Sequence, residues 1–500
     1  MKLMTGRKRI HSFVLFLGIA GLLFLHGCSN QPTIAGNCAN CHQPNLDDSH
    51  QFACTTCHRG DDKGKTEEQA HVGLIAQPAH PDNLEITCGN CHEEQVANVS
   101  QSLHYTLRNS VNLIRNNFGA TTELTTLTEI PITTNPDTVT ELADDLLRRR
   151  CLRCHLFSSG DNYSATRHAA GCGACHLSYT DGKLVNHDFA KRPGDDSCLS
   201  CHYGNRVGFD YYGRSEHDLN NEYRTPYTAQ DTTDRPYGVD YHELVPDIHQ
   251  QKGMVCIDCH AGNELMAPSK DTPKLSCRSC HDAAVLAGNT PLSAGVVRSD
   301  QSYSFTSRSS NTRYTLPVMQ HKAHTTYKAV DCQVCHAQWS FNDTQTHLMR
   351  SDLDEYDQWV HLTVQGNSEI EKLLEHNLDY DNEELAPSTT DKINGELRSG
   401  VWYKGYTMRR WEQLSVGRDS MGNLKVVRPM LNLSLSWVDE DGNVMFDNEE
   451  GSDNNAGMLP YIPHTTGPAG LFYEERLREI LAAEQNILKD TPNTHQSDDE

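Results

Sequence analysis

The cysteines of this chain follow one spacing rule. Nineteen cysteines occur in 500 residues, and eighteen of them form nine copies of the pattern C-x-x-C-H. Composition alone would produce on the order of 0.04 such copies in a chain of this length. The copies lie at 38–42, 54–58, 88–92, 151–155, 172–176, 198–202, 256–260, 277–281 and 332–336. Any fold of this chain must therefore place two cysteines and a histidine together nine times.

The pattern points to one chemistry. A zinc ribbon does not need a histidine directly after every second cysteine, and a redox dithiol occurs once, within a βαβ unit. Disulfides suit an exported chain but leave the nine histidines unexplained. C-x-x-C-H is the attachment pattern of c-type haem, in which the cysteines form thioethers with the two vinyl groups and the histidine binds iron. The sequence therefore predicts haem c as the cofactor, in nine copies.

The predicted attachment residues follow from the motifs. The covalent links would be made by Cys38, Cys41, Cys54, Cys57, Cys88, Cys91, Cys151, Cys154, Cys172, Cys175, Cys198, Cys201, Cys256, Cys259, Cys277, Cys280, Cys332 and Cys335. The proximal iron ligands would be His42, His58, His92, His155, His176, His202, His260, His281 and His336.

The N-terminus has the features of an export signal. A basic start, MKLMTGRKRI, is followed by an apolar stretch at 10–25 and by the sequence LHGC at 25–28. The stretch is shorter than the roughly 20 apolar residues that span a bilayer, so residues 1–27 are predicted to be a signal peptide. Leu-x-Gly-Cys resembles the lipobox of bacterial lipoproteins, which implies lipidation of Cys28. Ser29 follows, rather than the aspartate of inner-membrane lipoproteins, which favours the outer membrane. A plain secretory signal is the alternative.

On these motifs the chain resembles the multihaem c-type cytochromes over residues 38–336, in particular the outer-membrane lipoprotein cytochromes of metal-respiring bacteria. The resemblance implies mainly short α-helices and loops around a haem stack, with low regular structure. The apolar fraction is 37%, below the 45–50% that is typical of soluble domains. Haems are large apolar bodies, so they would supply the missing core.

Further histidines are candidates for the sixth iron ligand. We expect them shortly before a motif or on a short helix after one, as in this family. The predicted set is His50, His80, His104, His168, His187, His217, His249, His324 and His464. Three positions have rivals: His71 for His80, His242 for His217 and His321 for His324. His168 lies four residues before Cys172, too near to reach the far face of that haem, so it is expected to ligate a neighbouring one.

The motif spacing predicts three segments after the signal. A three-haem segment would span 28–130 and a six-haem segment 139–340, separated by a Thr- and Pro-rich linker or exposed loop at 121–138. A helix is predicted at 141–150, and a Ser/Thr-rich loop at 300–315. Residues 341–500 would form a haem-free α+β segment that caps the haems or binds a partner. Its strand at 430–437 alternates strictly and predicts a hairpin with 444–446. A helix is predicted at 471–488, before a disordered end.

Two functions fit these features. The preferred one is electron transfer through nine haems, mostly with two histidine ligands, in outer-membrane or extracellular respiration. Its partners would be other cytochromes, a porin-type conduit, and a metal or mineral acceptor. The alternative is a reductase or dehydrogenase that acts on a nitrogen or sulfur oxyanion, or on hydroxylamine, at one open haem. The Arg- and Tyr-rich stretch 203–227 is its candidate pocket, although such residues can also pair with haem propionates. The net charge of −24 argues against nucleic-acid binding.

Overall fold

The computed structural model describes residues 37–204, 206–216, 235–267, 275–288, 295–299, 302–341, 346–354, 366–379, 381–404, 414–451, 458–469 and 475–478. In these ranges regular structure is sparse and its elements are short. The longest helices, α4 (Gly89–Val99) and α7 (Val139–Arg149), have 11 residues each. No helix in the described part is long and apolar enough to cross a membrane.

The other helices range from three to ten residues. They are η1 (Asn37–Asn40), α1 (Cys54–His58), α2 (Glu67–Ala70), η2 (Pro81–Asn83), α3 (Leu84–Thr87), α5 (Leu103–Thr106), α6 (Arg108–Asn117), η3 (Leu127–Glu129), η4 (Cys151–Cys154), α8 (Gly173–His176), α9 (Asp195–His202), α10 (Val207–Tyr211), α11 (Ile248–Gln251), α12 (Cys256–Cys259), α13 (Gly262–Leu265), α14 (Arg278–His281), α15 (Ala283–Ala287), α16 (Ala323–Thr326), α17 (Cys332–His336) and α19 (Ser368–Asn377).

The strands form small, separate sheets. They are β1 (Tyr179–Thr180), β2 (Lys183–Leu184), β3 (Arg214–Glu216), β4 (Tyr241–Glu243), β5 (Val296–Ser299), β6 (Ser302–Thr306), β7 (Arg313–Thr315), β8 (Thr346–Ser351), β9 (Ser388–Thr390), β10 (Leu397–Ser399), β11 (Val401–Lys404), β12 (Val416–Arg418), β13 (Leu424–Pro429), β14 (Leu433–Val438), β15 (Val444–Glu450) and β16 (Met458–Pro460). The largest described sheet has four strands in the order β11-β8-β14-β15, with β14 parallel to β8 and the other pairs antiparallel.

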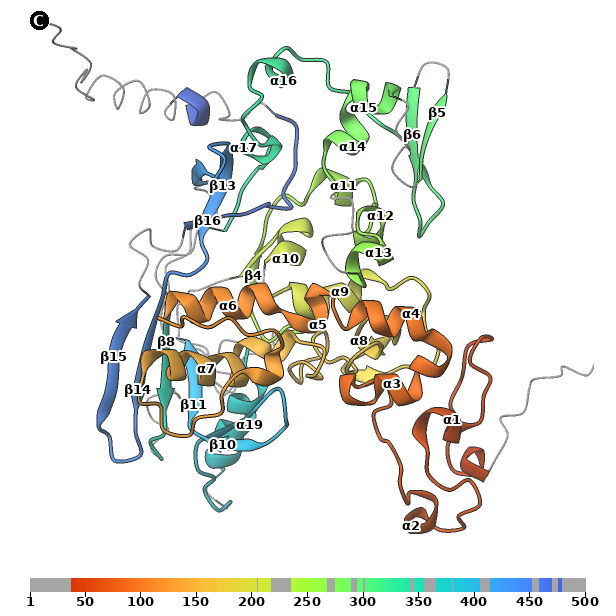
Figure 1. The fold of residues 1–500 in the computed structure, drawn as a ribbon, viewed down its shortest axis with the longest axis vertical. Helices are drawn as coiled ribbons and strands as arrows, with labels where there is room; N and C mark the ends of the chain where they lie inside the picture. The colour runs from red at the N-terminus through yellow and green to blue at the C-terminus, as the bar shows by residue number, and fades with distance from the viewer. Residues whose placement is uncertain are drawn as a thin grey trace, which may run out of the picture. The chain divides into compact units, whose positions relative to one another are not determined.

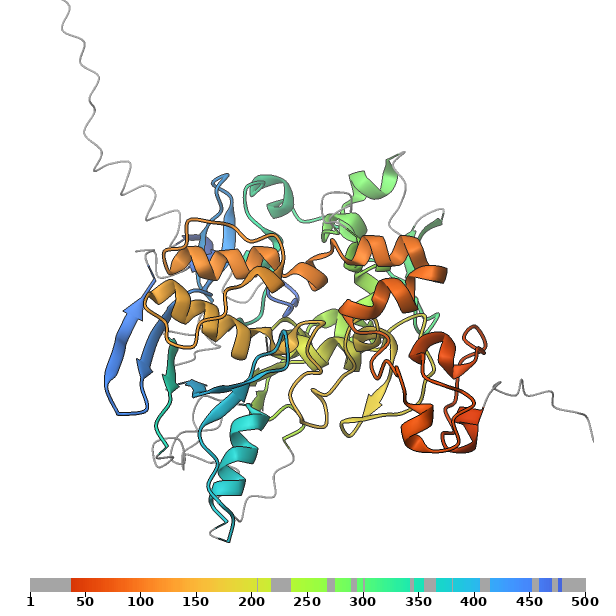
Figure 2. The ribbon, with the colours of Figure 1, turned by 60° about the horizontal axis from the view of Figure 1, so that its bottom comes forward.

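The main apolar core lies between helix α7 and this four-stranded sheet, which lie side by side in Figures 1 and 2. Thr138 caps the start of α7 by accepting the Glu141 N–H. Leu142 and Leu146, four residues apart and therefore on one face of the helix, are fully buried. They pack in one cluster with Leu435 and Trp437 of β14. Strand β14, with Leu435 and Trp437 buried, confirms the predicted strand, which begins at Leu433, and its antiparallel pairing with β15 confirms the predicted hairpin.

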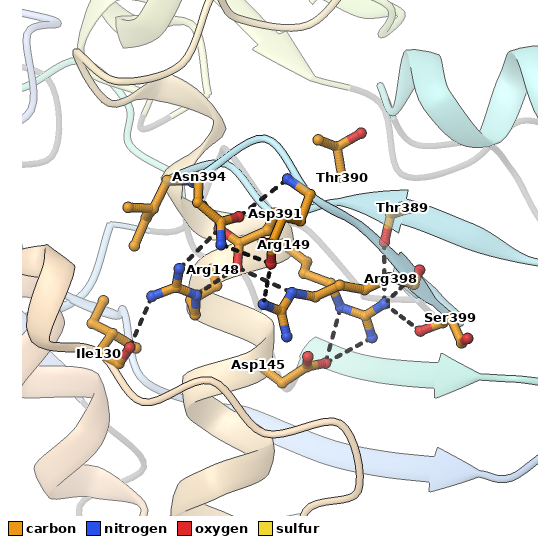
Figure 3. Close-up of polar contacts among 12 residues, drawn as sticks. Ile130, Asp145, Arg148, Arg149, Thr389, Thr390, Asp391, Asn394, Arg398 and Ser399 are labelled. Carbon is orange, nitrogen blue, oxygen red and sulfur yellow. Dashed lines mark hydrogen bonds and ion pairs between the residues drawn. The ribbon is translucent and has the colours of Figure 1, made fainter. Parts of the chain in front are cut away.

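Buried ion pairs join helix α7 to residues some 240 positions later in the chain (Figure 3). Arg148 donates to the Asp391 carboxylate at 2.5 Å and to the Ile130 carbonyl at 2.8 Å. Arg149 pairs with Asp145 at 2.7 Å and donates to the Ser399 carbonyl at 2.6 Å. The basic end of the predicted helix at 141–150 therefore anchors the C-terminal segment to the haem-motif region.

The chain divides into two compact units between Ile75 and Ala76, and the segment bounds at 130–139 and 340–341 stay predictions. The stretch 121–138 is for the most part an exposed loop, as predicted, but Leu127 and Ile130 anchor it: they are 2% exposed and pack against Leu147 and Leu152. Residues of 341–500 likewise share a core with α7. The stretch 300–315 is largely a sheet of β5, β6 and β7. Of the predicted helix at 471–488, only 475–478 are described, and they are helical.

Candidate haem-binding site

Eight of the nine motifs end in the same way, with the histidine in or directly after a helical turn that holds both cysteines. A residue and those three and four positions later lie on one face of a helix, so C-x-x-C-H presents two thiols and an imidazole together. The backbone N–H of the motif histidine bonds to the carbonyl of the first cysteine, four residues back, in five motifs at 2.9 to 3.0 Å: those of His42, His92, His176, His260 and His281. The motif at 151–155 departs from this pattern and is described below.

Five motif histidines each face one histidine from elsewhere in the chain. The separation of the ring centroids is 6.1 to 6.3 Å in all five pairs. The pairs are His42–His71, His202–His104, His281–His249, His260–His464 and His336–His324. Each contains one motif histidine and one other histidine, which is the composition expected of the two axial ligands of one haem.

The separation also fits an iron atom between the rings. A bond of about 2.0 Å from a first-row metal to each nitrogen, with about 1.2 Å from nitrogen to ring centre, places two axial imidazole centroids about 6.4 Å apart. Imidazoles in van der Waals contact would stack more closely, and a direct hydrogen bond between them would need facing nitrogens near 3 Å. The interplanar angles range from 7° to 73°, and rotation of a ring about its iron–nitrogen bond leaves the separation unchanged.

The hydrogen bonds of the rings set the tautomer that metal binding requires. A carbonyl can only accept, so a ring whose Nδ1 meets one carries its proton there and leaves the Nε2 lone pair for a metal. Nδ1 lies 2.7 to 3.2 Å from a backbone carbonyl in His58, His104, His176, His281, His336 and His464. It meets a carboxylate in His50, His249 and His260.

Burial keeps several of these rings neutral. The pKa of His104, His281 and His464 is lowered chiefly because burial disfavours the charged imidazolium. A backbone carbonyl at each Nδ1 opposes this shift, and a neighbouring histidine adds to it. Neutral imidazole is the form that binds iron. Desolvation favours this neutral form, and the Nδ1 contacts fix its tautomer.

Four of the nine predicted sixth ligands therefore stand opposite a motif histidine: His104, His249, His324 and His464. His324, rather than its rival His321, occupies the position opposite His336. His71, the rival of His80, faces His42; it follows helix α2, whose start is capped by Thr66. The one sequence feature that marks His71 is the capped acidic turn TEEQAH at 66–71. This turn does not lie shortly before a motif, where a sixth ligand is expected.

The other predicted sixth ligands have different surroundings. His50 bonds to Asp47 at 2.7 Å, and His80 starts helix η2 with its ring 5.3 Å from that of Phe157. His168 is 3% exposed, and its Nε2 lies 3.6 Å from the Cys201 sulfur of a different motif. His187 follows β2 in the chain. His217 lies outside the described residues.

His155 is placed unlike the other motif histidines. Its motif forms the 3₁₀ turn η4, and its N–H bonds to Leu152, three residues back. Nε2 meets the Tyr105 carbonyl at 2.5 Å while Nδ1 accepts the Phe157 N–H at 3.2 Å. This is the opposite tautomer. The ring is 1% exposed, and burial lowers its pKa to about 4, against the opposing effect of the Tyr105 carbonyl. A proximal role for His155 thus stays a prediction that this arrangement does not favour.

The thiols of different motifs lie beside one another. Direct neighbours are Cys38 and Cys54, Cys88 and Cys172, Cys154 and Cys201, Cys198 and Cys256, and Cys277 and Cys332. Cys175 also lies near Cys198, and Cys259 near Cys280. In the larger unit these contacts connect the third motif to the fifth, and then the fifth, sixth, seventh, eighth and ninth motifs in turn. The thiol of the fourth motif lies beside that of the sixth.

The described part of the Arg- and Tyr-rich stretch 203–227 is largely structural. Arg206 pairs with Glu216. The Arg214 guanidinium lies 5.2 to 5.8 Å from four aromatic ring centroids, those of Phe209, Tyr212, Tyr237 and Tyr241. Tyr203 is 3% exposed, and its hydroxyl has no hydrogen-bond partner in the described chain. Residues 217–227 of the stretch lie outside the described ranges.

Within those ranges, no three His, Cys, Asp or Glu side chains gather as they would around a metal ion held by protein alone. A haem iron takes at most two ligands from the protein, and the five imidazole pairs supply that number. No protein-family model, curated protein or solved structure matches this chain.

Proposed function

We propose that this protein transfers electrons through nine c-type haems, each attached by one C-x-x-C-H motif. The observation that carries the proposal is the set of five imidazole pairs, each joining one motif histidine to one other histidine at 6.1 to 6.3 Å. Haem iron cycles between its ferric and ferrous states and so carries single electrons. A pair of imidazoles closes both axial positions, which leaves no site for a substrate and suits an electron carrier.

The neighbouring thiols support a route for the electrons. Haems that are attached to adjacent cysteines must lie near one another, because each thioether is only a few bonds long. In the larger unit the route would run through the third, fifth, sixth, seventh, eighth and ninth motifs, in the order set by the thiol neighbours. The fourth motif would branch from the sixth, where Cys154 meets Cys201.

The cellular setting is proposed from the sequence. The signal at 1–27 and the lipobox ending at Cys28 place the protein at the outer membrane, held by a lipid anchor. There it would exchange electrons with other cytochromes or a porin-type conduit and deliver them to a metal or mineral acceptor. The net charge of −24 favours cationic partners or acceptors over anionic ones.

The test begins with the protein purified from a host that matures c-type cytochromes. We expect the intact mass to exceed that of the processed polypeptide by nine haems, and Cys256→Ser/Cys259→Ser to lose one haem. A protein that carries no covalent haem, or that carries zinc instead, would overturn the proposal. Mass of the N-terminal peptide tests the anchor, because lipidated Cys28 must be its first residue.

A second candidate is a multihaem reductase with one open haem at the fourth motif. It is favoured by the placement of His155, whose Nε2 faces a carbonyl, and by the buried polar groups nearby. Arg153 pairs with Asp161 at 2.9 Å, and the unpartnered Tyr203 hydroxyl lies in the same charged surroundings. Arginine binds oxyanions and tyrosine can donate a proton.

Electron paramagnetic resonance separates the two candidates. A carrier with closed axial positions gives low-spin signals that nitrite, sulfite and hydroxylamine leave unchanged. An open haem gives a high-spin signal that shifts with one of these ligands, and Arg153→Lys would weaken that binding because it removes the planar, two-pronged donor.

A further inference from the structure

Residues 463–467, a short part of the C-terminal segment, lie among three of the imidazole pairs. Its His464 faces His260. The Gly467 carbonyl accepts from His336 Nδ1 at 3.0 Å, and the Gly467 N–H donates to the His336 carbonyl at 2.8 Å. Thr465 is fully buried and bonds to the Trp339 carbonyl through its hydroxyl. A segment far from any cysteine thus faces one motif histidine and hydrogen-bonds to another.

Asp247 links this segment to the third pair. One carboxylate oxygen accepts from both the backbone N–H and the Nδ1 of His249, each at 2.8 Å. The other accepts the Thr466 N–H at 2.7 Å. His249 in turn faces His281. The carboxylate therefore hydrogen-bonds to an imidazole pair through His249 and to the segment 463–467 through Thr466.

The carboxylate is buried without a basic side chain to balance it. Asp247 is 3% exposed. In the described chain its one ion-pair contact is with the ring of His249. Three hydrogen bonds, two from His249 and one from Thr466, are donated to the buried carboxylate and favour its ionised form. Its negative charge then acts on His249 at short range through a medium of low polarity.

An anionic partner at Nδ1 makes an imidazole a stronger donor to its metal. The ferric state carries one more positive charge than the ferrous state, so both the donor strength and the negative charge favour ferric iron. The other two pairs beside the segment differ: the Nδ1 of His464 and of His336 face neutral backbone carbonyls. The Nδ1 of His260 does meet the Glu264 carboxylate at 3.2 Å, but that side chain is 33% exposed, whereas the Asp247 side chain is 4% exposed. The His249–His281 pair is thus distinguished from them by a buried charge.

We propose that Asp247 is a positioning residue that orients His249 and lowers the reduction potential of the haem held by His249 and His281. The inference rests on the proposed function, since it needs a haem at that pair. Such a haem would be harder to reduce than its neighbours along the route. Its reduction potential would lie below those of the haems at the seventh and ninth motifs.

The competing explanation is that Asp247 only caps helix α11, whose N-cap it occupies. Asparagine caps helices as well as aspartate does, so Asp247→Asn keeps the cap and removes the charge. Asp247→Glu keeps the charge. Asp258→Asn is the matched control, because Asp258 is also buried, inside the seventh motif, but accepts from the backbone N–H of Val255 and of Arg308 rather than from a histidine.

The test is spectroelectrochemical titration of the full-length protein, with haems counted by mass. We expect Asp247→Asn to keep nine haems and to raise one midpoint potential by a tenfold change in the reduction equilibrium, which is 59 mV for one electron. Asp247→Glu should restore most of the original value, and Asp258→Asn should leave that potential in place.

Unchanged potentials in Asp247→Asn with nine haems present would overturn the inference and leave the proposed function standing. Absence of haem from the unmodified protein would instead overturn the proposed function. If Asp247→Asn does not fold, Asp247→Ser keeps the cap and gives the same test. The low-spin resonance of one haem must also change in Asp247→Asn and Asp247→Ser, because the Nδ1 of His249 loses its anionic partner.

Discussion

His464 is the member of the five imidazole pairs that lies outside the motif-bearing region. Its ring centroid is 6.3 Å from that of His260. We expect His464→Ala to open one axial position, so that one haem becomes high-spin while nine haems remain attached by mass. Electron paramagnetic resonance of the oxidised protein measures this.

His376→Ala is the matched control. His376 lies in the same C-terminal segment, and its Nε2 meets the Glu383 carbonyl at 2.9 Å. The spectrum of this variant should equal that of the unmodified protein. A high-spin haem in both variants, or in neither, would remove His464 from the ligand set.

At the scale of single residues, the sequence predicted the motif side of each candidate haem site. The spacing C-x-x-C-H identifies the cysteines and the adjacent histidine because they share one helical turn. The facing histidine comes from a distant part of the chain and has no local pattern. His104 follows the third motif but faces His202 of the sixth, and proximity in sequence pointed to His80 where the structure brings His71 to His42. Only the tertiary fold decides such partners.

At the scale of elements, the arginines at the end of α7 hold the C-terminal segment in place. Asp145 accepts from Arg149 and from the Trp402 indole at 2.7 Å each, and its side chain is 4% exposed. Removing one partner of a buried ion pair costs about 3–5 kcal/mol. Asp145→Asn should lower the free energy of unfolding by that amount, measured by denaturant titration, without loss of haem.

A surface pair serves as the comparison. Glu396 is 66% exposed and pairs with Arg398 at 3.2 Å, and exposed pairs contribute at most about 1 kcal/mol. If Glu396→Gln destabilises the protein as much as Asp145→Asn does, the ion pairs in Figure 3 are not what joins α7 to the C-terminal segment.

Helix α19 carries a pH-dependent element. Burial raises the pKa of Glu371 from 4.5 to about 7, although Tyr163 and Arg235 oppose the shift. The folded chain then keeps a proton that the unfolded chain releases first, so stability is full below pH 4.5 and falls as the pH rises towards 7. The loss is on the order of 3 kcal/mol. Thermal unfolding between pH 4.5 and 7 should show this fall, and Glu371→Gln should flatten it.

Short-range patterns predicted some elements and missed others for a common reason. Helix α7 and the β14–β15 hairpin have strong periodicity and local caps, and they form where expected. Residues 121–138 and 300–315 are rich in Thr and Ser, which favours loops. The first stretch is largely an exposed loop anchored by two side chains, whereas in the second stretch tertiary contacts override this preference. Leu127 and Ile130 fill a core formed with α7, and Phe305 of β6 is 4% exposed within a three-stranded sheet.

At the scale of the whole molecule, the thiol neighbours make the sixth motif the branch point of the larger unit. Cys198 lies beside a thiol of the seventh motif, and Cys201 lies beside a thiol of the fourth. Cys198 also lies near Cys175 of the fifth motif. Cys198→Ser/Cys201→Ser should remove one haem and slow electron transfer between the remaining groups. The matched variant Cys332→Ser/Cys335→Ser removes a terminal haem and should slow transfer less, as measured by flash photoreduction.

The measurement that tests the central claim most directly is near-infrared magnetic circular dichroism of the oxidised full-length protein, quantified against its haem content. If the five facing imidazole pairs are axial ligand pairs, at least five of the nine haems must give the charge-transfer band of low-spin iron with two histidine ligands. Fewer than five such haems, or a band from another ligand pair in their place, would contradict the account.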